Sequence, residues 1–409
     1  MEPEIHTKKL YSNITKNYIF LGLTTLDLTR GLWMIFLFSR GFSLIELGIL
    51  EGVFHLTTFV MEIPTGIVAD LWGRRLSRLL GRIIFLISLG IMFWSYSFTL
   101  QLIGFIITAI GYNLESGAGE ALLYDSMKEL GIEEQYKKTA GKNNFVDWMG
   151  GILSFLIGGY FAVHLGYTWV FIPSMIICII SIFVTYSMHE PSLTQHEQIR
   201  LRKMGWIKAM GVQTIESLKV VKERPKIAFL ILFSELIFMF LASLFFYLQT
   251  YWKGNGWDEF QIGMVLAGSG LLSAIAGLTG HRIEKKIGEK GVLLIAPLLL
   301  IITLWGIALT HYAPFFFIIT GLIDGLLYVA IQDYINKMIP SERRATVLSF
   351  QSMTFSFYMI IFFPAVGFFG DRYGLEYSFL GLAVIGTVMY GFYTVHHNLN
   401  RDVSPAGSG

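Results

Sequence analysis

The fold of this chain of 409 residues is decided by one stretch, Gly66-Ile67-Val68-Ala69-Asp70-Leu71-Trp72-Gly73-Arg74-Arg75. It closes a long apolar run with two glycines, an aspartate and two arginines, and eleven further apolar runs surround it. We place the twelve runs at residues 18–38, 44–69, 77–98, 100–123, 143–163, 167–188, 227–251, 259–280, 291–311, 314–337, 345–369 and 376–396.

The composition is that of a membrane protein. Hydrophobic residues make up 54% of the chain, charged residues 15%, and the mean hydropathy is +0.59. A helix crosses a bilayer with roughly 20 apolar residues, and backbone groups in lipid must be paired within helices or a closed barrel. The runs are too continuously apolar for barrel strands, so we predict an all-α polytopic membrane protein with twelve transmembrane helices.

Positive charge predicts the topology of these helices. If the N-terminus is cytoplasmic, 26 of the 31 lysines and arginines fall in inside segments, and two, Arg30 and Arg82, lie within spans. The outside loops then hold only Arg40, Lys253 and Arg372. Inside loops of membrane proteins carry such an excess, so both termini are predicted to be cytoplasmic and the protein to lie in the inner (plasma) membrane.

Four segments follow from this pattern. Residues 1–188 form an N-terminal six-helix bundle, and residues 227–400 form a C-terminal one. Between them, residues 189–226 are predicted to be a cytoplasmic central loop, in which an apolar stripe with flanking lysines indicates an interfacial helix. A mobile linker is the alternative for this loop. Residues 401–409 are a tail whose last residues look cloning-derived, and no cleavable signal peptide is expected at the start.

Two six-helix halves joined by a long loop, with the charged turn at 66–75, resemble the major facilitator superfamily of secondary transporters. Gly66, Asp70, Gly73, Arg74 and Arg75 match the motif of that family's loop between helices 2 and 3, whereas Val68 and Leu71 depart from it. The resemblance covers nearly the whole chain and implies two pseudo-symmetric bundles.

The resemblance also implies a gate. In the family, this motif locks the cytoplasmic ends of helices 2 and 11 in the outward-open state. Asp70 is expected to meet the N-terminal dipole of another helix, and Arg74 to bind a carboxylate such as Asp125. A similar stretch, Gly370-Asp371-Arg372-Tyr373-Gly374, falls outside by topology, and we interpret it as the turn after the eleventh span.

Charges within the spans are the candidate site residues, because a charge in hydrocarbon costs at least about 2.5 kcal/mol and usually faces a cavity or a partner. Spacing puts Asp27 and Arg30 on one helix face, where they form either a proton-switched pair or a permanent salt bridge. Structural pairing is expected for Glu62, Asp147 and Asp333. The family's central cavity is lined by helices 1, 4, 7 and 10. The candidates for proton and substrate binding are Asp27, Arg30, Glu51, Glu115, Glu120, Glu235 and Asp324.

These features predict a proton-coupled transporter that works by alternating access, with export of amphipathic, cationic compounds as the first interpretation. Two motifs of exporters are incomplete, because Asn113 stands for the helix 4 arginine and Ser154-Phe155 for a Gly-Pro pair in helix 5. An importer or facilitator of a small polar nutrient therefore stays open, as does a receptor that moves nothing.

The expected partners are a small-molecule substrate, protons and lipid, and the protein is expected to act as a monomer. A net charge of +2 gives no reason to expect nucleic acid binding. The single cysteine, Cys178, lies in an apolar run and is expected to be a buried structural thiol. No spacing of side chains indicates a metal site, a cofactor or an enzymatic centre.

Overall fold

A computed structural model describes residues 2–192, 225–338 and 344–402 of the chain. Within these ranges every regular element is a helix. The elements are α1 (Glu2–Thr25), α2 (Trp33–Ser39), α3 (Leu44–Trp72), α4 (Arg74–Trp94), α5 (Phe98–Glu129), η1 (Glu133–Gln135), α6 (Tyr136–His164), α7 (Thr168–Tyr186), α10 (Pro225–Gly254), α11 (Glu259–Leu309), α12 (Ala313–Met338), α13 (Arg344–Tyr373) and α14 (Leu375–Asp402).

Eleven segments of the described residues are long and apolar enough to cross a membrane. Two of them lie in α11, which bends where Gly288 adopts a positive φ of 73°. The twelfth predicted span, 18–38, is discontinuous: it consists of the end of α1, a non-helical stretch at 26–32, and the short helix α2. The predicted order of helices is confirmed, but the continuity of the first helix is wrong.

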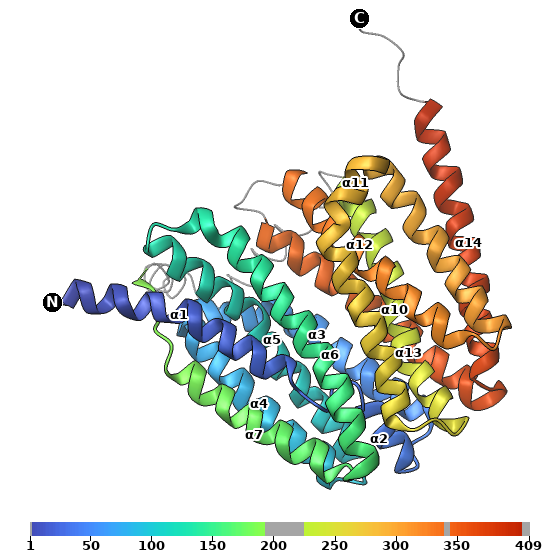
Figure 1. Cartoon of the computed structure of the whole chain (residues 1–409), viewed down its shortest axis with the longest axis horizontal. Coiled ribbons are helices and arrows are strands. Elements are labelled where there is room, and N and C mark those ends of the chain that lie inside the picture. The colour runs from blue at the N-terminus through green and yellow to red at the C-terminus, as the bar shows by residue number, and fades with distance from the viewer. Residues whose placement is uncertain (1, 193–224, 339–343, 403–409) are drawn as a thin grey trace, which may run out of the picture.

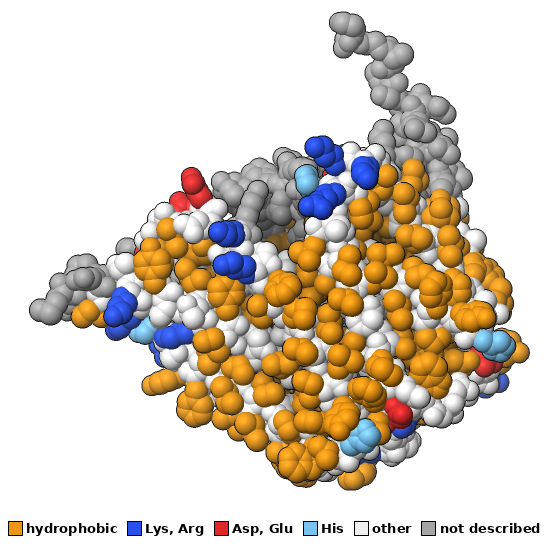
Figure 2. Space-filling model, viewed as in Figure 1, with side chains coloured by type: hydrophobic (Ala, Val, Ile, Leu, Met, Phe, Trp, Pro, Cys, Tyr) orange, Lys and Arg blue, Asp and Glu red, His pale blue; other side chains and the backbone are white. Residues whose placement is uncertain are grey.

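The helices form two bundles, α1 to α7 and α10 to α14, which lie side by side in Figure 1. In Figure 2 hydrophobic side chains cover the middle of the visible surface, and most Lys, Arg, Asp and Glu side chains lie near its rim. A helical bundle with an apolar belt is what lipid contact requires.

Because successive spans run in opposite directions, their turns fall on two faces. We call the face with Gly73, residues 130–135 and Gly288 the basic face, and the face with Gly41, Gly166 and Gly374 the opposite face. The two bundles touch closely near the opposite face. At the basic face, by contrast, no described atom lies within 4 Å of the position that a Cβ would take at Gly66.

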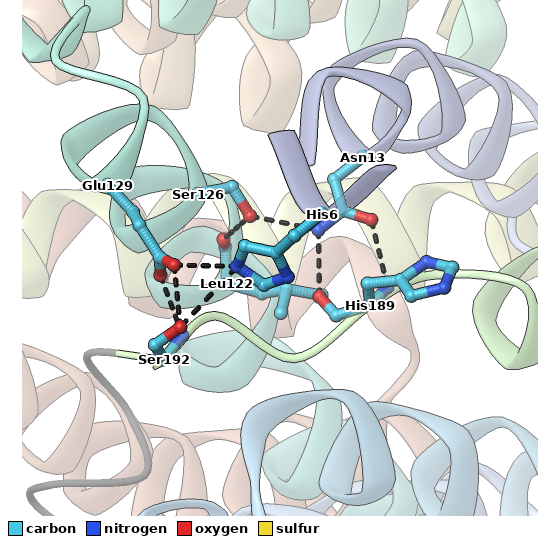
Figure 3. Close-up of polar contacts among 7 residues, drawn as sticks. All are labelled: His6, Asn13, Leu122, Ser126, Glu129, His189 and Ser192. Atoms are coloured by element: carbon cyan, nitrogen blue, oxygen red, sulfur yellow. Dashed lines mark hydrogen bonds and ion pairs between the residues drawn. The ribbon is translucent and has the colours of Figure 1, made fainter. Parts of the chain in front are cut away.

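The central segment begins on the N-terminal bundle (Figure 3). The amide of Asn13 donates to the carbonyl of His189 at 2.8 Å and to Ser126 Oγ at 2.9 Å. Glu129 accepts from Ser192 Oγ at 2.6 Å and contacts His6 Nε2 at 2.7 Å. Residues 189–192 are thus fastened to α1 and α5, and the predicted interfacial helix of the central loop lies outside the described residues.

Candidate functional site

The break in the first helix is stabilised by side chains from two other helices. Ser154 Oγ of α6 donates to the carbonyl of Asp27 at 2.5 Å, and the Leu28 N–H donates to Ser174 Oγ of α7 at 3.0 Å. The Asp27 carboxylate accepts from the N–H and the hydroxyl of Thr29 at 3.0 and 2.7 Å. Interrupted spans are tolerated where such groups satisfy the freed backbone, and they expose polar atoms at mid-membrane depth.

The predicted pairing of Asp27 with Arg30 is wrong, because these residues are not on a helix. Arg30 Nη1 instead lies 3.8 Å from Asp147 Oδ1 on α6, with about half of each side chain exposed. Structural pairing was expected for Asp147, and the residue both pairs with Arg30 and lines the same cavity. A long, half-exposed ion pair is weak, so both charges remain available to a bound solute.

Glu235 is the most enclosed acid of the site, with 5% of the residue exposed. Its Oε1 accepts from Gln351 Nε2 of α13 at 2.6 Å and from Ser234 Oγ at 3.4 Å. The Gln351 amide oxygen faces Gln332 Nε2 of α12 at 3.4 Å. No Lys, Arg or His of the described residues lies within ion-pair distance of Glu235, so its partners are neutral hydrogen-bond donors.

Two further acids lie in different bundles, one on α12 and one on α3. Asp324 Oδ2 on α12 accepts from Ser273 Oγ of α11 at 2.6 Å. Glu51 Oε1 on α3 lies 3.5 Å from His55 Nε2, and His55 Nδ1 lies 3.4 Å from Ser356 Oγ of α13. His55 therefore connects the two bundles. A second contact joins the same two helices, because Ser352 Oγ of α13 donates to Glu62 of α3 at 3.3 Å.

The acids described above, except Glu62, line one cavity of about 680 Å³ between the bundles, which is within the usual size of a ligand site. Both halves contribute polar and aromatic walls. Its acidic and basic lining residues are Asp27, Arg30, Glu51, Asp147, Glu235 and Asp324. Five of the seven candidates from the sequence are therefore brought together.

Aromatic rings close the cavity toward the opposite face. Trp33 packs against Phe105 and Phe246 with centroids 5.1 and 5.3 Å apart, and Phe246 packs against Phe363 at 5.5 Å. Trp33 and Phe363 are buried, whereas Tyr328, which lines the cavity nearer the basic face, is 44% exposed. The aromatic layer therefore separates the cavity from the opposite face.

Comparison with known proteins identifies the family. A family model described as Major Facilitator Superfamily matches residues 19–317 and 255–407. The chain belongs to the major facilitator superfamily. Two curated relatives carry the same family name, and both align over most of their length. The MFS-type transporter YxaM of Bacillus subtilis (strain 168) is 22% identical over 396 residues, which is 89% of this chain and 90% of that protein. The MFS-type transporter MJ1560 of Methanocaldococcus jannaschii is 21% identical over 394 residues, covering 92% and 98%.

Solved structures of the superfamily share the fold. The nucleoside transporter NupG superposes with a TM-score of 0.74 at 15% identity, over 94% of this chain and 98% of that chain. A D-xylose-proton symporter superposes with a TM-score of 0.69 at 14% identity, over 95% and 97%. These likenesses establish an MFS transporter fold, with its two six-helix bundles, for the present chain.

The superfamily's loop motif is partly assembled. Gly73, with a φ of 105°, separates α3 from α4, and Arg74 forms the predicted ion pair with Asp125 and donates to the carbonyl of Ala121 at 2.9 Å. Sequence reasoning missed Glu190, whose carboxylate accepts from the Arg74 and Arg75 N–H groups, each at 2.8 Å. Its position two residues into a polar loop gave no periodic signal.

The expected contact of Asp70 with the start of the eleventh span involves residues outside the described ranges. Around Gly66 the described atoms leave the Cβ position open. The Arg74–Asp125 ion pair of the motif is formed within the N-terminal bundle.

Two candidates lie apart from the cavity lining. Glu115 pairs with Arg78, whose Nε is 3.3 Å from Glu115 Oε1, and Arg78 is almost fully buried. Glu120 is exposed and is not among the residues that line the cavity. Sequence spacing placed both on the fourth span but could not tell an internal ion pair from a cavity wall. In the described residues no three His, Cys, Asp or Glu side chains gather as a metal site.

Proposed function

We propose that this superfamily member is a proton-coupled importer of a small polar solute that works by alternating access. The observation that carries the proposal is a cavity between the bundles, which five acids and one arginine line from both halves. Charged groups at mid-membrane depth are expensive and mark solute and proton pathways. The surplus of acids suits a solute rich in hydroxyl or amine donors.

The orientation follows from charge. With the basic face cytoplasmic, both termini lie inside the cell and the protein resides in the inner (plasma) membrane. The cavity then opens inward and is closed outward by the aromatic layer at Trp33 and Phe246. In this arrangement the protein would release an imported solute.

Glu235 is the proposed proton carrier. It is enclosed, it lines the cavity, and the groups that contact it are the neutral Gln351 and Ser234. A carboxyl group in this position takes up or loses a proton without breaking an ion pair. Gln351 donates to it and spans from α13 to α10, so a change in protonation alters a contact between helices.

Asp324 and the Arg30–Asp147 pair are the proposed solute contacts. Asp324 lies across the cavity on α12 and keeps one carboxylate oxygen for a ligand while Ser273 occupies the other. Aromatic lining residues such as Phe54, Phe238 and Phe355 offer ring faces to the apolar side of a sugar or a base. The MFS transporters of known structure that share this fold include one for nucleosides and one for D-xylose with protons, which favours import over export.

Uptake into proteoliposomes tests the proposal, with radiolabelled D-xylose and uridine as probes. We expect an acidic exterior to drive accumulation of at least one probe above its equilibrium level. Glu235→Gln should lose this accumulation while retaining exchange of labelled for unlabelled solute, because only proton coupling is removed. The matched control is Glu376→Gln, an exposed acid on the opposite face that accepts from Tyr251 at 3.2 Å.

Two results would count against parts of this proposal, the first against Glu235 as the proton carrier and the second against import. Accumulation by Glu235→Gln at the level of the unaltered protein would remove this residue from the coupling step. Proton-driven extrusion of ethidium, with no uptake of either probe, would favour the second candidate function, export of amphipathic cations. The observation that favours export is the aromatic lining around an acidic cavity, which also suits a lipophilic cation.

A further inference from the structure

The opposite face is held shut by two seams that are built alike. At the first seam α3 meets α13, and at the second α11 meets α6. Both α3 and α11 begin with a capping box, Ser43 with Glu46 and Asp258 with Gln261. The two helix starts are therefore equivalent, as expected for the repeated halves of a transporter.

Glycines bring the backbones together at both seams. A Cβ on Gly159 would lie 2.6 Å from the carbonyl oxygen of Glu259, and a Cβ on Gly367 would collide with the carbonyl oxygen of Leu44. Such distances exclude a side chain, so each seam packs backbone against backbone. Leu44 and Glu259 are each the first residue of their helix, so the two contacts are equivalent.

One difference between the seams lies four residues beyond the contact glycines. Counting four residues on from the contact glycines gives Asp371 at the end of α13 and Val163 at the end of α6. The Asp371 carboxylate crosses to the other bundle, where Oδ1 accepts from the Leu44 N–H at 3.0 Å and Oδ2 from the Ile45 N–H at 2.7 Å. The predicted turn at 370–374 is wrong in its extent, since α13 continues to Tyr373.

Asp371 completes a cap that α3 cannot complete alone. The first turn of a helix has N–H groups without partners in the helix. In α3 the side chain of Ser43 accepts from the Glu46 N–H at 3.3 Å, and Glu46 accepts from the Ser43 N–H at 2.8 Å. The remaining donors of this turn, on Leu44 and Ile45, are the two that Asp371 accepts, and its charge also faces the positive end of the helix dipole.

We propose that Asp371 is a latch for the opposite face: its carboxylate holds the C-terminal bundle to the start of α3 when that face is closed and releases it when that face opens. Opening of the seam must separate Gly367 from Leu44, and the latch then loses both hydrogen bonds. The inference rests on alternating access as proposed above, but not on protons or on the identity of the solute.

Distances between spin labels test the latch in lipid nanodiscs without solute and without a pH gradient. Cys178→Ser removes the native thiol. The label pair Leu165→Cys and Tyr377→Cys spans the opposite face, and the pair Lys128→Cys and Lys286→Cys spans the basic face; all four positions are exposed.

We expect Asp371→Asn to raise the ratio of open to closed populations at the opposite face by about tenfold, because a charged cap across an interface is lost. The basic-face pair should shorten in step. Arg372→Gln, on the neighbouring exposed residue, should change neither distribution, and Asp371→Glu should restore most of the closed population. If Asp371→Ala and Asp371→Asn both leave the two distributions unchanged, the latch is refuted. Since no transport is measured, this outcome is independent of the test of Glu235.

Discussion

Replacing Arg78 by methionine should destabilise the N-terminal bundle more than any surface substitution. Arg78 is 2% exposed, and its Nη1 donates to Asn17 Oδ1 at 2.9 Å. Its guanidinium lies 3.3 Å from Glu115 and 3.6 Å from the centre of the Phe20 ring. One side chain on α4 thus binds groups from α1 and α5.

The magnitude follows from what the substitution leaves behind. Methionine fills much of the volume, so the main loss is the charge that compensates Glu115. Removing one partner of a buried pair costs about 3–5 kcal/mol, and the lower end applies because the Glu115 side chain is still 24% exposed. We expect the free energy of unfolding to fall by about 3 kcal/mol. Adding Glu115→Gln should recover roughly half of that loss, since the amide needs no counter-charge.

Unfolding by sodium dodecyl sulfate, followed by tryptophan fluorescence, measures these differences for the single and double variants. Arg372→Met serves as the control, because Arg372 is exposed at the other face. If Arg78→Met lies within about 0.5 kcal/mol of the unaltered protein, or if Glu115→Gln brings no recovery, the charge-compensation argument is refuted.

Three further predictions concern the gate, the seams and the basic face. Asp125→Asn should weaken the contact with Arg74 and lower the thermal midpoint of the protein by a few degrees; an unchanged midpoint would contradict it. Gly159→Val should abolish uptake while leaving the protein soluble in detergent as a single species, because the seam against Glu259 has no room for a side chain; full uptake would contradict it. Glu129 lies beyond the apolar run of α5, at the basic face. Burial raises the pKa of its carboxyl group, but hydrogen bonds from Ser192 and His6 outweigh burial. The pKa of Glu129 is therefore below its ordinary value. Its stabilising contribution is therefore present above about pH 4.3 and is lost as the pH falls through the lowered value, so Glu129→Gln should flatten the acid limb of an unfolding titration.

Periodic and local signals predicted most of the fold. Apolar length placed eleven of the twelve spans within several residues of their helices, and the pair Arg74 with Asp125 followed from charge and topology. The break at 26–32 did not follow, because Leu-Asp-Leu-Thr-Arg-Gly-Leu contains no proline and reads as one more helical turn. It depends on Ser154 and Ser174, which meet the chain only after folding.

The sequence singled out five of the six charged residues that line the cavity, but not how they pair. Charge inside a span singled out Asp27, Glu235 and Asp324, since desolvation makes such residues rare without a purpose. Which carboxylate faces which donor depends on helix rotation, which spacing along one helix cannot give. The neutral residues Gln351 and Ser273 carry no such penalty, so nothing in their local sequence distinguished them.

The interrupted first helix has a mechanical consequence. In the C-terminal bundle α10 runs unbroken from Pro225 to Gly254, whereas its counterpart changes direction between Thr25 and Trp33. A continuous helix transmits a displacement from one end to the other, whereas an interrupted helix absorbs it at the non-helical stretch. The two halves have the same arrangement of helices but should respond differently to a bound solute. The continuous α10 should transmit a movement across the bilayer, whereas the interrupted first span should bend around the solute.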